Sequence, residues 1–180
     1  MRFTIRPARP EDAPVLQSIE RLAGERFREV GLDAVADDEP MSIETLVSYA
    51  GDGRSWVAIG EDGAPCGYLL VDDVDGAAHV EQVSVVPAWQ GQGVGRALID
   101  RAEQWAAATG RAAVTLSTFA DVPWNRPLYE HLGFRVLSED GIGPGLAQVR
   151  DHEAAMGFDP AARVMMRRDI ARGLREPPLR

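Results

Sequence analysis

The sequence predicts a single α/β domain built around a mixed β-sheet. Three observations lead to this prediction. The chain has 180 residues, 45% of them hydrophobic and 26% charged, so it can bury the core of one ordinary globular domain. Segments with strand and helix patterns alternate along most of its length. A run of glycines separates an apolar strand segment from an amphipathic helix segment. We expect one domain over residues 1–170 and a tail at residues 171–180.

The first part of the chain predicts one strand and two helices. The strand is expected over residues 3–6. Asp12 is placed to cap a helix whose apolar residues recur at helical spacing. Ser42 is expected to cap the second helix. Between the helices, residues 24–40 show no regular pattern and include the acidic run 37–39.

The middle part predicts an antiparallel meander and then a long helix. Turn signals at Glu61-Asp62-Gly63 and Asp75-Gly76 separate apolar runs of strand length. The three strands are expected over residues 56–59, 68–71 and 79–86. The helix is expected over residues 93–109, with small and apolar residues on one face.

The last part returns to strands, which we expect over residues 112–116, 134–137 and 164–168. A short helix is expected over residues 128–132, and residues 146–156 predict a helix inserted between the last two strands. The predicted sheet therefore has about six or seven strands, flanked by helices, and the chain shows no internal repeat.

Composition and charge restrict the classes of partner. The formal net charge is −9 and no long basic stretch occurs, which argues against nucleic-acid binding and permits a cationic partner. The single cysteine, Cys66, allows no internal disulfide, as is typical of a reducing compartment. Neither a signal-peptide pattern nor a long apolar run is present. We therefore expect a cytoplasmic protein that does not bind membranes.

The glycine run has the pattern G-x-G-x-G, formed by Gly91, Gly93 and Gly95. The dinucleotide-binding fingerprint requires a third glycine where Arg96 stands, and the Gly-Lys-Ser/Thr of a nucleotide-hydrolase phosphate loop is absent. A strand, a glycine loop and a helix N-terminus together still make a general anion site. The alternative is a tight strand-to-helix connection that binds nothing.

Three motifs in register resemble the GNAT superfamily of N-acetyltransferases. The segment QGQGVG at residues 90–95 fits the acetyl-coenzyme A signature Gln/Arg-x-x-Gly-x-Gly/Ala. The strand VSVVP precedes it, and LYEHLGF follows at residues 128–134. The order of elements is also similar. The resemblance implies a GNAT-like fold with acetyl-coenzyme A as co-substrate and no metal. It also implies acetyl transfer by direct attack in a ternary complex, the acceptor being a primary amine of a small molecule or a peptide N-terminus.

The resemblance also implies how the coenzyme is bound. Backbone groups of residues 83–85 would pair with the pantetheine arm and supply an oxyanion donor, while amides of the glycine loop would hold the pyrophosphate. The residues implied are Val83, Ser84, Val85, Gln90, Gly91, Gln92, Gly93, Val94, Gly95, Arg96 and Asn125. The common family pattern has its asparagine seven residues before the tyrosine, at Val122, whereas Asn125 lies only four before Tyr129. Asn125 is expected to cap the short helix, to contact the coenzyme, or both.

Acetyl transfer to an amine requires a base for the amine proton, a donor for the oxyanion and an acid for the leaving thiolate. Tyr129 stands where the family places its general acid. For the base we favour Glu81, which strand alternation places on one face with Val83 and Val85. His79 is the second candidate.

The resemblance builds the acceptor site partly from late strand connections, here the insert at residues 141–159, and partly from the region between the first strand and the second helix. The residues implied there are Glu20, Phe27 and Arg28. The acidic stretch 33–39 would favour a cationic amine, whereas Arg28 could instead hold a substrate carboxylate.

Two other functions remain open at this point. One is a non-catalytic regulator that binds acyl-coenzyme A. The other is a toxin-type acetyltransferase acting on aminoacylated tRNA. The net charge of −9 argues against this function, because binding tRNA requires a basic surface. A monomer and a homodimer are both compatible with the sequence.

Overall fold

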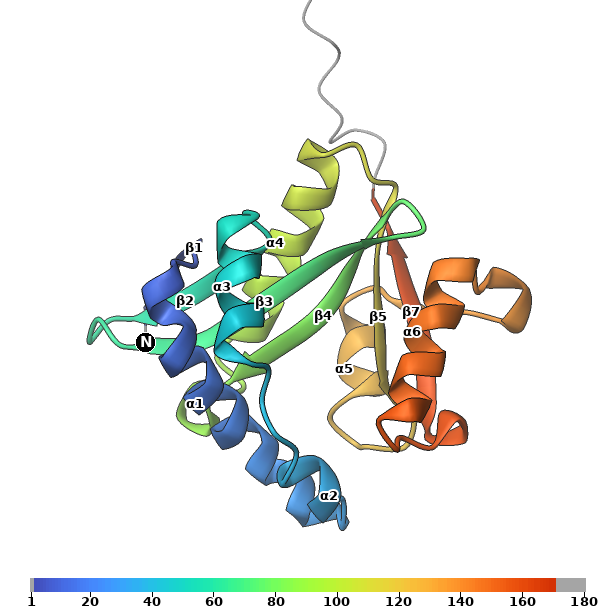
Figure 1. Ribbon diagram of the computed structural model, residues 1–180, viewed down its shortest axis with the longest axis horizontal. Coiled ribbons are helices and arrows are strands. Elements are labelled where there is room, and N and C mark those ends of the chain that lie inside the picture. The colour runs from blue at the N-terminus through green and yellow to red at the C-terminus, as the bar shows by residue number, and fades with distance from the viewer. Residues whose placement is uncertain (1, 171–180) are drawn as a thin grey trace, which may run out of the picture. The chain divides into compact units, whose positions relative to one another are not determined.

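The computed structural model describes residues 2–170 (Figure 1). These residues fall into two compact units. The first holds residues 2–71 and 82–101, and the second holds residues 72–81 and 102–170. Strands β3 and β4 each contribute residues to both units. The predicted tail at residues 171–180 lies outside the described residues.

The strands form the mixed sheet that the sequence predicts, in the order β1-β2-β3-β4-β5-β7-β6. They are β1 (Phe3–Pro7), β2 (Ser55–Gly60), β3 (Pro65–Val74), β4 (Ala77–Val85), β5 (Ala113–Phe119), β6 (Arg135–Val136) and β7 (Arg163–Asp169). Strand β4 pairs with β5 in parallel, whereas β1 with β2, β2 with β3, β5 with β7 and β6 with β7 are antiparallel. The predicted sheet of about six or seven strands is confirmed.

The helices also follow the predicted order. The α-helices are α1 (Ala13–Gly24), α2 (Asp33–Ala36), α3 (Ile43–Gly51), α4 (Val94–Ala108), α5 (Arg126–His131) and α6 (Pro144–Ala155). Short 3-10 helices are η1 (Pro10–Asp12), η2 (Glu25–Val30), η3 (Pro87–Trp89), η4 (Glu139–Gly141) and η5 (Pro160–Ala162). Helix α6 is the insertion that the sequence predicts between the last two strands.

The core of the first unit lies between helices α1 and α3 and one face of β2 and β3 (Figure 1). Leu16 and Ile19, three residues apart on α1, are buried there with Leu46 of α3. Val57 and Leu70 supply the facing strand side chains. The helical spacing of apolar residues therefore predicted the buried face of α1 correctly.

Of the two predicted helix caps at the N-terminal end, Ser42 is confirmed, whereas Asp12 occupies the N-cap position of α1 without a capping hydrogen bond. Ser42 Oγ accepts a hydrogen bond from the Thr45 amide at 3.1 Å, as a capping serine does. Asp12 makes no such bond to α1, because it lies in the preceding 3-10 turn. Its carboxylate instead accepts from the Arg9 amide at 2.7 Å and pairs with Arg6.

The segment predicted as irregular, residues 24–40, contains the short helices η2 and α2. Gly31 ends η2 with φ of +72°, in the left-handed region that favours glycine. One guanidinium, that of Arg28, pairs with carboxylates from both short helices and from Asp37, which follows them. Charge contacts thus hold a segment that has little apolar periodicity.

The second unit is built on β5 and β7, which pair along their whole length from Ala113↔Asp169 to Phe119↔Arg163. The predicted turn at Asp75-Gly76 is confirmed, since both residues have positive φ, +51° and +71°. The Asp75 carboxylate also accepts hydrogen bonds from the amides of Gly145 and Leu146, at 2.8 and 2.9 Å. This contact fixes the start of α6 within the unit.

All cations in the ion pairs described within residues 2–170 are arginines, because the sequence has 19 arginines and no lysine. The pairs Arg163–Glu153 and Arg168–Glu103 are the least exposed of them. The planar guanidinium suits such half-buried pairs, because it can donate several hydrogen bonds in fixed directions.

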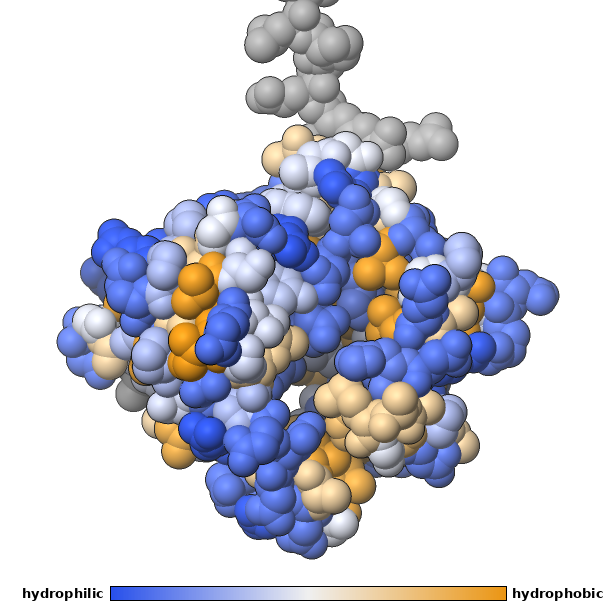
Figure 2. Space-filling model, in the orientation of Figure 1, coloured by the Kyte–Doolittle hydropathy of each residue, from blue (hydrophilic) through white to orange (hydrophobic). Residues whose placement is uncertain are grey.

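The surface seen in Figure 2 is mostly hydrophilic, with small and separate hydrophobic patches. The exposed large hydrophobic side chains among the described residues are Leu22, Val30, Leu128 and Met156. Within residues 2–170, every helix is too short or too polar to cross a membrane.

Candidate active site

The glycine loop of the first unit lies between the end of β4 and the start of α4. Gly91 and Gly93 have φ of +74° and +85°, so both positions favour glycine for their backbone conformation. Gly95 lies in the first turn of α4, with ordinary helical backbone. A Cβ atom built on Gly91 or Gly93 would meet no atom within 4 Å. Open space therefore faces the loop, as a ligand-binding backbone requires.

Side chains of the loop itself hold it against the strand. Gln90 Nε2 donates to the carbonyl of Val85 at 2.9 Å, and Gln92 Nε2 donates to the carbonyl of Ala88 at 2.7 Å. The guanidinium of Arg26, on η2, donates to Gln90 Oε1 at 3.3 Å. The loop is therefore held to the chain that precedes it, and a cationic side chain lies next to it.

Two further glycines of the first unit permit close approach to this region. A Cβ on Gly67 of β3 would lie 2.9 Å from the Ser84 carbonyl oxygen, and one on Gly60 would lie 2.5 Å from Cζ2 of Trp89. Neither glycine has a role that the sequence predicts. A glycine inside a strand pattern is the signal that could have found them.

The predicted coenzyme residues other than Asn125 all belong to the first unit. Val83 and Val85 are half-buried on β4, and Ser84 between them is buried. Arg96 is exposed in the first turn of α4. The first amide groups of a helix have no partner within the helix, and the helix dipole is positive at that end. This unit alone therefore brings a strand end, a glycine loop and a helix N-terminus together, an arrangement that binds anions in other proteins.

Glu81, the predicted base, belongs to the second unit and is half-buried. Burial raises the pKa of its carboxyl, and the negative charges of Asp72 and Glu153 raise it further, while His152 opposes them. A carboxylate with a raised pKa has a higher affinity for a proton, which suits a base.

Tyr129, the predicted acid, also belongs to the second unit and is half-buried on α5. Its ring meets that of Phe134 edge-on, with centroids 5.9 Å apart. Burial raises the pKa of its phenol to about 12, so the hydroxyl keeps its proton at neutral pH. The protonated phenol is the form that a general acid requires.

The structure is less favourable to His79 as a base. The side chain is 2% exposed and its Nδ1 lies 3.0 Å from Thr115 Oγ1. Burial lowers the pKa of the imidazole to about 4, so it is neutral at physiological pH and enclosed.

Asn125 occupies the N-cap position of α5, but its side chain makes no capping hydrogen bond. The expected side-chain cap is therefore wrong. The backbone at Asn125, with φ of −96° and ψ of −88°, has left the extended conformation that capping residues usually adopt. Its contact with the coenzyme stays a prediction.

The predicted acceptor residues lie in the first unit. Glu20 is half-buried on α1 and accepts hydrogen bonds from Tyr68 and Gln82. Phe27 is half-buried on η2. Arg28 donates to Asp37 at 2.6 Å and to Glu25 at 3.0 Å. A pocket of about 220 Å³ adjoins Arg28 and is lined by Arg21, Glu25, Arg28, Ala36, Asp37, Asp38 and Glu39.

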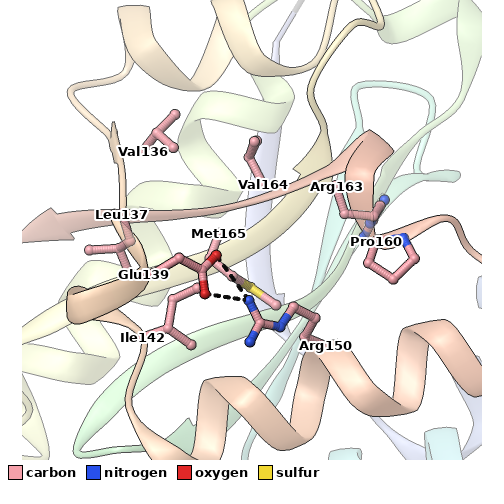
Figure 3. Close-up of a pocket in the computed structure, with 9 residues that line it drawn as sticks. All are labelled: Val136, Leu137, Glu139, Ile142, Arg150, Pro160, Arg163, Val164 and Met165. Carbon is pink, nitrogen blue, oxygen red and sulfur yellow. Dashed lines mark hydrogen bonds and ion pairs between the residues drawn. The ribbon is translucent and has the colours of Figure 1, made fainter.

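A second pocket, of about 120 Å³, lies in the second unit and contains none of the predicted site residues (Figure 3). It is lined by Val136, Leu137, Glu139, Ile142, Arg150, Pro160, Arg163, Val164 and Met165. Arg150 of α6 pairs with both carboxylate oxygens of Glu139, at 3.1 and 3.0 Å. The guanidinium and carboxylate that border this pocket therefore neutralise each other.

Within residues 2–170, no three or more histidine, cysteine, aspartate or glutamate side chains form a cluster able to hold a metal ion.

Comparison with known proteins gives one family and a large group of structures. Residues 16–134 match the model of the acetyltransferase (GNAT) family. The ribosomal-protein-S18-alanine N-acetyltransferase from Escherichia coli is 21% identical, with a TM-score of 0.64 over 94% of this chain and 95% of that one. PaiA N-acetyltransferase from Thermoplasma acidophilum, solved with coenzyme A, is 16% identical, with a TM-score of 0.70 over 94% and 99%. YncA from Salmonella typhimurium, solved with acetyl-CoA, is 20% identical, with a TM-score of 0.66 over 95% of each chain. At these identities the structural likeness shows the fold.

Proposed function

The chain belongs to the GNAT family of acetyltransferases, and from this premise we propose that it transfers an acetyl group from acetyl-coenzyme A to a primary amine. The family match confirms the resemblance read from the sequence, and with it that the protein is an acyltransferase. Which residues act, and on which amine, are the proposals that follow.

The observation that carries the proposal is the geometry of the glycine loop. Its two positive-φ glycines face open space, and the loop leads directly into the N-terminus of α4. Backbone amides in that arrangement bind phosphate oxygens. We assign the pyrophosphate of the coenzyme to the amides of residues 91–96, and the pantetheine arm to the backbone of residues 83–85.

Two residues each have one role in the chemical step. The neutral amine nitrogen attacks the thioester carbonyl carbon, and the carbon–sulfur bond breaks as the amide forms. Glu81 accepts the proton that the amine loses, and Tyr129 donates a proton to the departing thiolate. Backbone amide groups of β4 stabilise the oxyanion. Holding both substrates in place lowers the barrier further, because the entropic cost of bringing them together is met when they bind and not in the chemical step.

The contacts of Arg28 support a cationic acceptor over an anionic one. Its guanidinium already pairs with Glu25, Asp33 and Asp37 of its own chain. A substrate carboxylate would have to displace these partners, and it would meet their negative charge. We therefore assign Glu20, Phe27 and Arg28 to the wall of a site for an amine that carries positive charge.

The remaining assignments follow from charge and composition. With a net charge of −9, the acceptor is a small molecule or a peptide N-terminus and not an aminoacylated tRNA. The single cysteine supports a reducing, cytoplasmic location. Both a monomer and a homodimer remain compatible with the function.

The test is a panel of amines incubated with acetyl-coenzyme A, in which release of the coenzyme thiol is measured. We expect release to depend on the amine and on the protein, and mass spectrometry to find one acetyl group on the amine. Coenzyme binding by calorimetry without release for any amine would instead support a non-catalytic regulator. Acetylation of aminoacylated tRNA in a parallel reaction would contradict the proposed acceptor class.

A further inference from the structure

A half-buried carboxylate in the first unit has neutral hydrogen-bond donors and takes part in none of the ion pairs described within residues 2–170. Glu20 Oε2 accepts from the phenol of Tyr68 at 2.6 Å, and Oε1 accepts from the amide of Gln82 at 2.8 Å. The backbone amide of Met41 is a third donor. Tyr68 itself is completely buried, so two strands and a loop hold this carboxylate in a fixed position.

The charged group that acts on Glu20 has the wrong sign to stabilise it. None of the ion pairs described within residues 2–170 includes Glu20. Asp38 is close enough to raise the pKa of the Glu20 carboxyl, although burial is the larger cause. A half-buried carboxylate that lacks a cation is unfavourable, because its neutral donors only partly replace the water that it has lost. The arrangement becomes favourable when a positive group binds.

The Glu20 carboxylate lies on the same unit as the coenzyme loop. Gln82, one of its donors, immediately precedes Val83 on β4, the strand whose end leads into that loop. The backbone to which the pantetheine arm is assigned therefore begins one residue after a hydrogen-bond donor of Glu20.

The chemistry decides which cation Glu20 can hold. The attacking nitrogen must be neutral, so it gives its proton to a base, the role assigned to Glu81. A positive group that stays paired with Glu20 throughout the reaction therefore belongs to a second nitrogen of the acceptor, which keeps its charge.

We propose that Glu20 binds a second, non-reacting cationic group of the acceptor, so that the substrate is a diamine or another molecule with two cationic nitrogens. Tyr68 and Gln82 are positioning residues that direct the carboxylate. The inference rests on the proposed acetyl transfer and names the class of its acceptor.

The test compares α,ω-diaminoalkanes of three to six carbons with n-alkylamines of the same length, by thiol release from acetyl-coenzyme A. We expect the wild type to have a KM at least tenfold lower for its best diamine than for the matched monoamine. Glu20→Gln keeps the shape and removes the charge, so the KM for diamines should rise about tenfold or more while that for monoamines stays within twofold. Glu44→Gln, an exposed glutamate on α3, is the control and should change neither KM.

A second variant keeps the test decisive if Glu20→Gln folds poorly. Glu20→Asp keeps the charge and withdraws the carboxylate by one methylene group, so the preferred diamine should become longer by about one carbon. No preference for diamines in the wild type overturns the proposal, as does an equal effect of Glu20→Gln on both amine classes. Failure of the acetyl transfer itself looks different, because the wild type would then release no thiol with any amine.

Discussion

The guanidinium of Arg6 forms a two-pronged pair with the carboxylate of Asp12. Nη1 lies 2.7 Å from Oδ2, and Nη2 lies 3.0 Å from Oδ1. The Asp12 side chain is 10% exposed, and it also accepts a hydrogen bond from the Arg9 amide. The pair joins β1 to the turn that precedes α1, so it fixes the first connection of the chain. The hydrogen bond from Arg6 is the largest of the causes that lower the pKa of the Asp12 carboxyl.

Arg6→Ala should lower the free energy of unfolding at pH 7 by about 1–2 kcal/mol, since a charge-assisted hydrogen-bonded pair is lost. Because the folded-state pKa of Asp12 is depressed, the stabilisation is complete above its unfolded pKa of 3.8 and is lost as the pH falls through the folded value. Urea denaturation at several pH values between 7 and 3 measures both effects. Arg126→Ala, which breaks an exposed pair with Glu130, should cost less than about 0.5 kcal/mol. Losses that are equal for the two variants, or independent of pH, would contradict this account.

Gly93→Asp should abolish most of the affinity for acetyl-coenzyme A, because it places a negative side chain in the space facing the loop. We expect binding at least thirtyfold weaker, equivalent to about 2 kcal/mol. The matched control is Gly53→Asp, another exposed glycine with positive φ and no atom within 4 Å of its Cβ. Both variants carry the same backbone strain, of about 1 kcal/mol, but only the first should lose affinity in titration calorimetry. Equal affinity of Gly93→Asp and the wild type would place the coenzyme elsewhere.

Tyr129→Phe should lower kcat by about 10²-fold or more, the usual contribution of a general acid, with coenzyme affinity nearly unchanged. The fold should survive, because the ring keeps its edge-on contact with Phe134. With a phenol pKa of about 12, the acid loses its proton only as the pH rises towards that value. The wild type should therefore show no loss of kcat from Tyr129 ionisation below about pH 10. An unchanged kcat in the variant with the best amine would remove this role.

Glu81→Gln deletes the proton acceptor and keeps the shape, so folding and coenzyme binding should be retained. The fall in kcat/KM should be greatest near neutral pH, where the amine is mostly protonated, at about 10²-fold. Much of the rate should return at high pH, where the amine is already neutral. The measurement is the pH profile of kcat/KM, and parallel profiles for variant and wild type would refute the base role.

Asp72→Asn supplies an independent check on Glu81. Burial and the charge of Asp72 raise the pKa of the Glu81 carboxyl, in that order, so removing the charge should lower it. In the variant, the fall in kcat/KM at acid pH should then occur at lower pH than in the wild type, because Glu81 loses its proton and becomes a base at a lower pH. A shift in the opposite direction would mean that another group produces that limb.

The parts of the fold that the sequence predicted depend on neighbours in the chain. Ser42 caps α3 through an amide three residues away, and Leu16 and Ile19 share a helix face. The Asp75-Gly76 turn is likewise decided by two adjacent residues. Periodicity and turn chemistry suffice for such features.

The features that were missed depend on side-chain contacts that no periodic pattern encodes. Asp12 looked like a cap, but Arg6 and the Arg9 amide compete for its carboxylate. The hydrogen bonds of Glu20 were not predicted, because its partners Tyr68 and Gln82 lie 48 and 62 residues away in the sequence. No pattern of neighbouring residues indicates a hydrogen bond between positions so far apart in the sequence.

The short helices η2 and α2 have a similar origin. They stand where the sequence showed an irregular acidic segment, and the guanidinium of Arg28 gathers carboxylates from both. Intrinsic propensity stabilises helices this short very little, because the free-energy cost of nucleation exceeds the stabilisation from the hydrogen bonds of one turn. Ion pairs of this kind between nearby charged residues cannot be predicted from the periodicity of apolar residues.

The cation of every ion pair described in the structure is an arginine, and the sequence contains no lysine. This composition determines whether the enzyme can acetylate its own side chains. Guanidinium groups stay protonated at any physiological pH, so they are not nucleophiles towards a thioester. The side chains of this enzyme therefore offer no amine that could compete with the acceptor for the acetyl group. Any acetyl-lysine that appears in a reaction with a peptide or protein must lie on that added molecule. Antibodies against acetyl-lysine can thus report transfer directly, without a background from the enzyme.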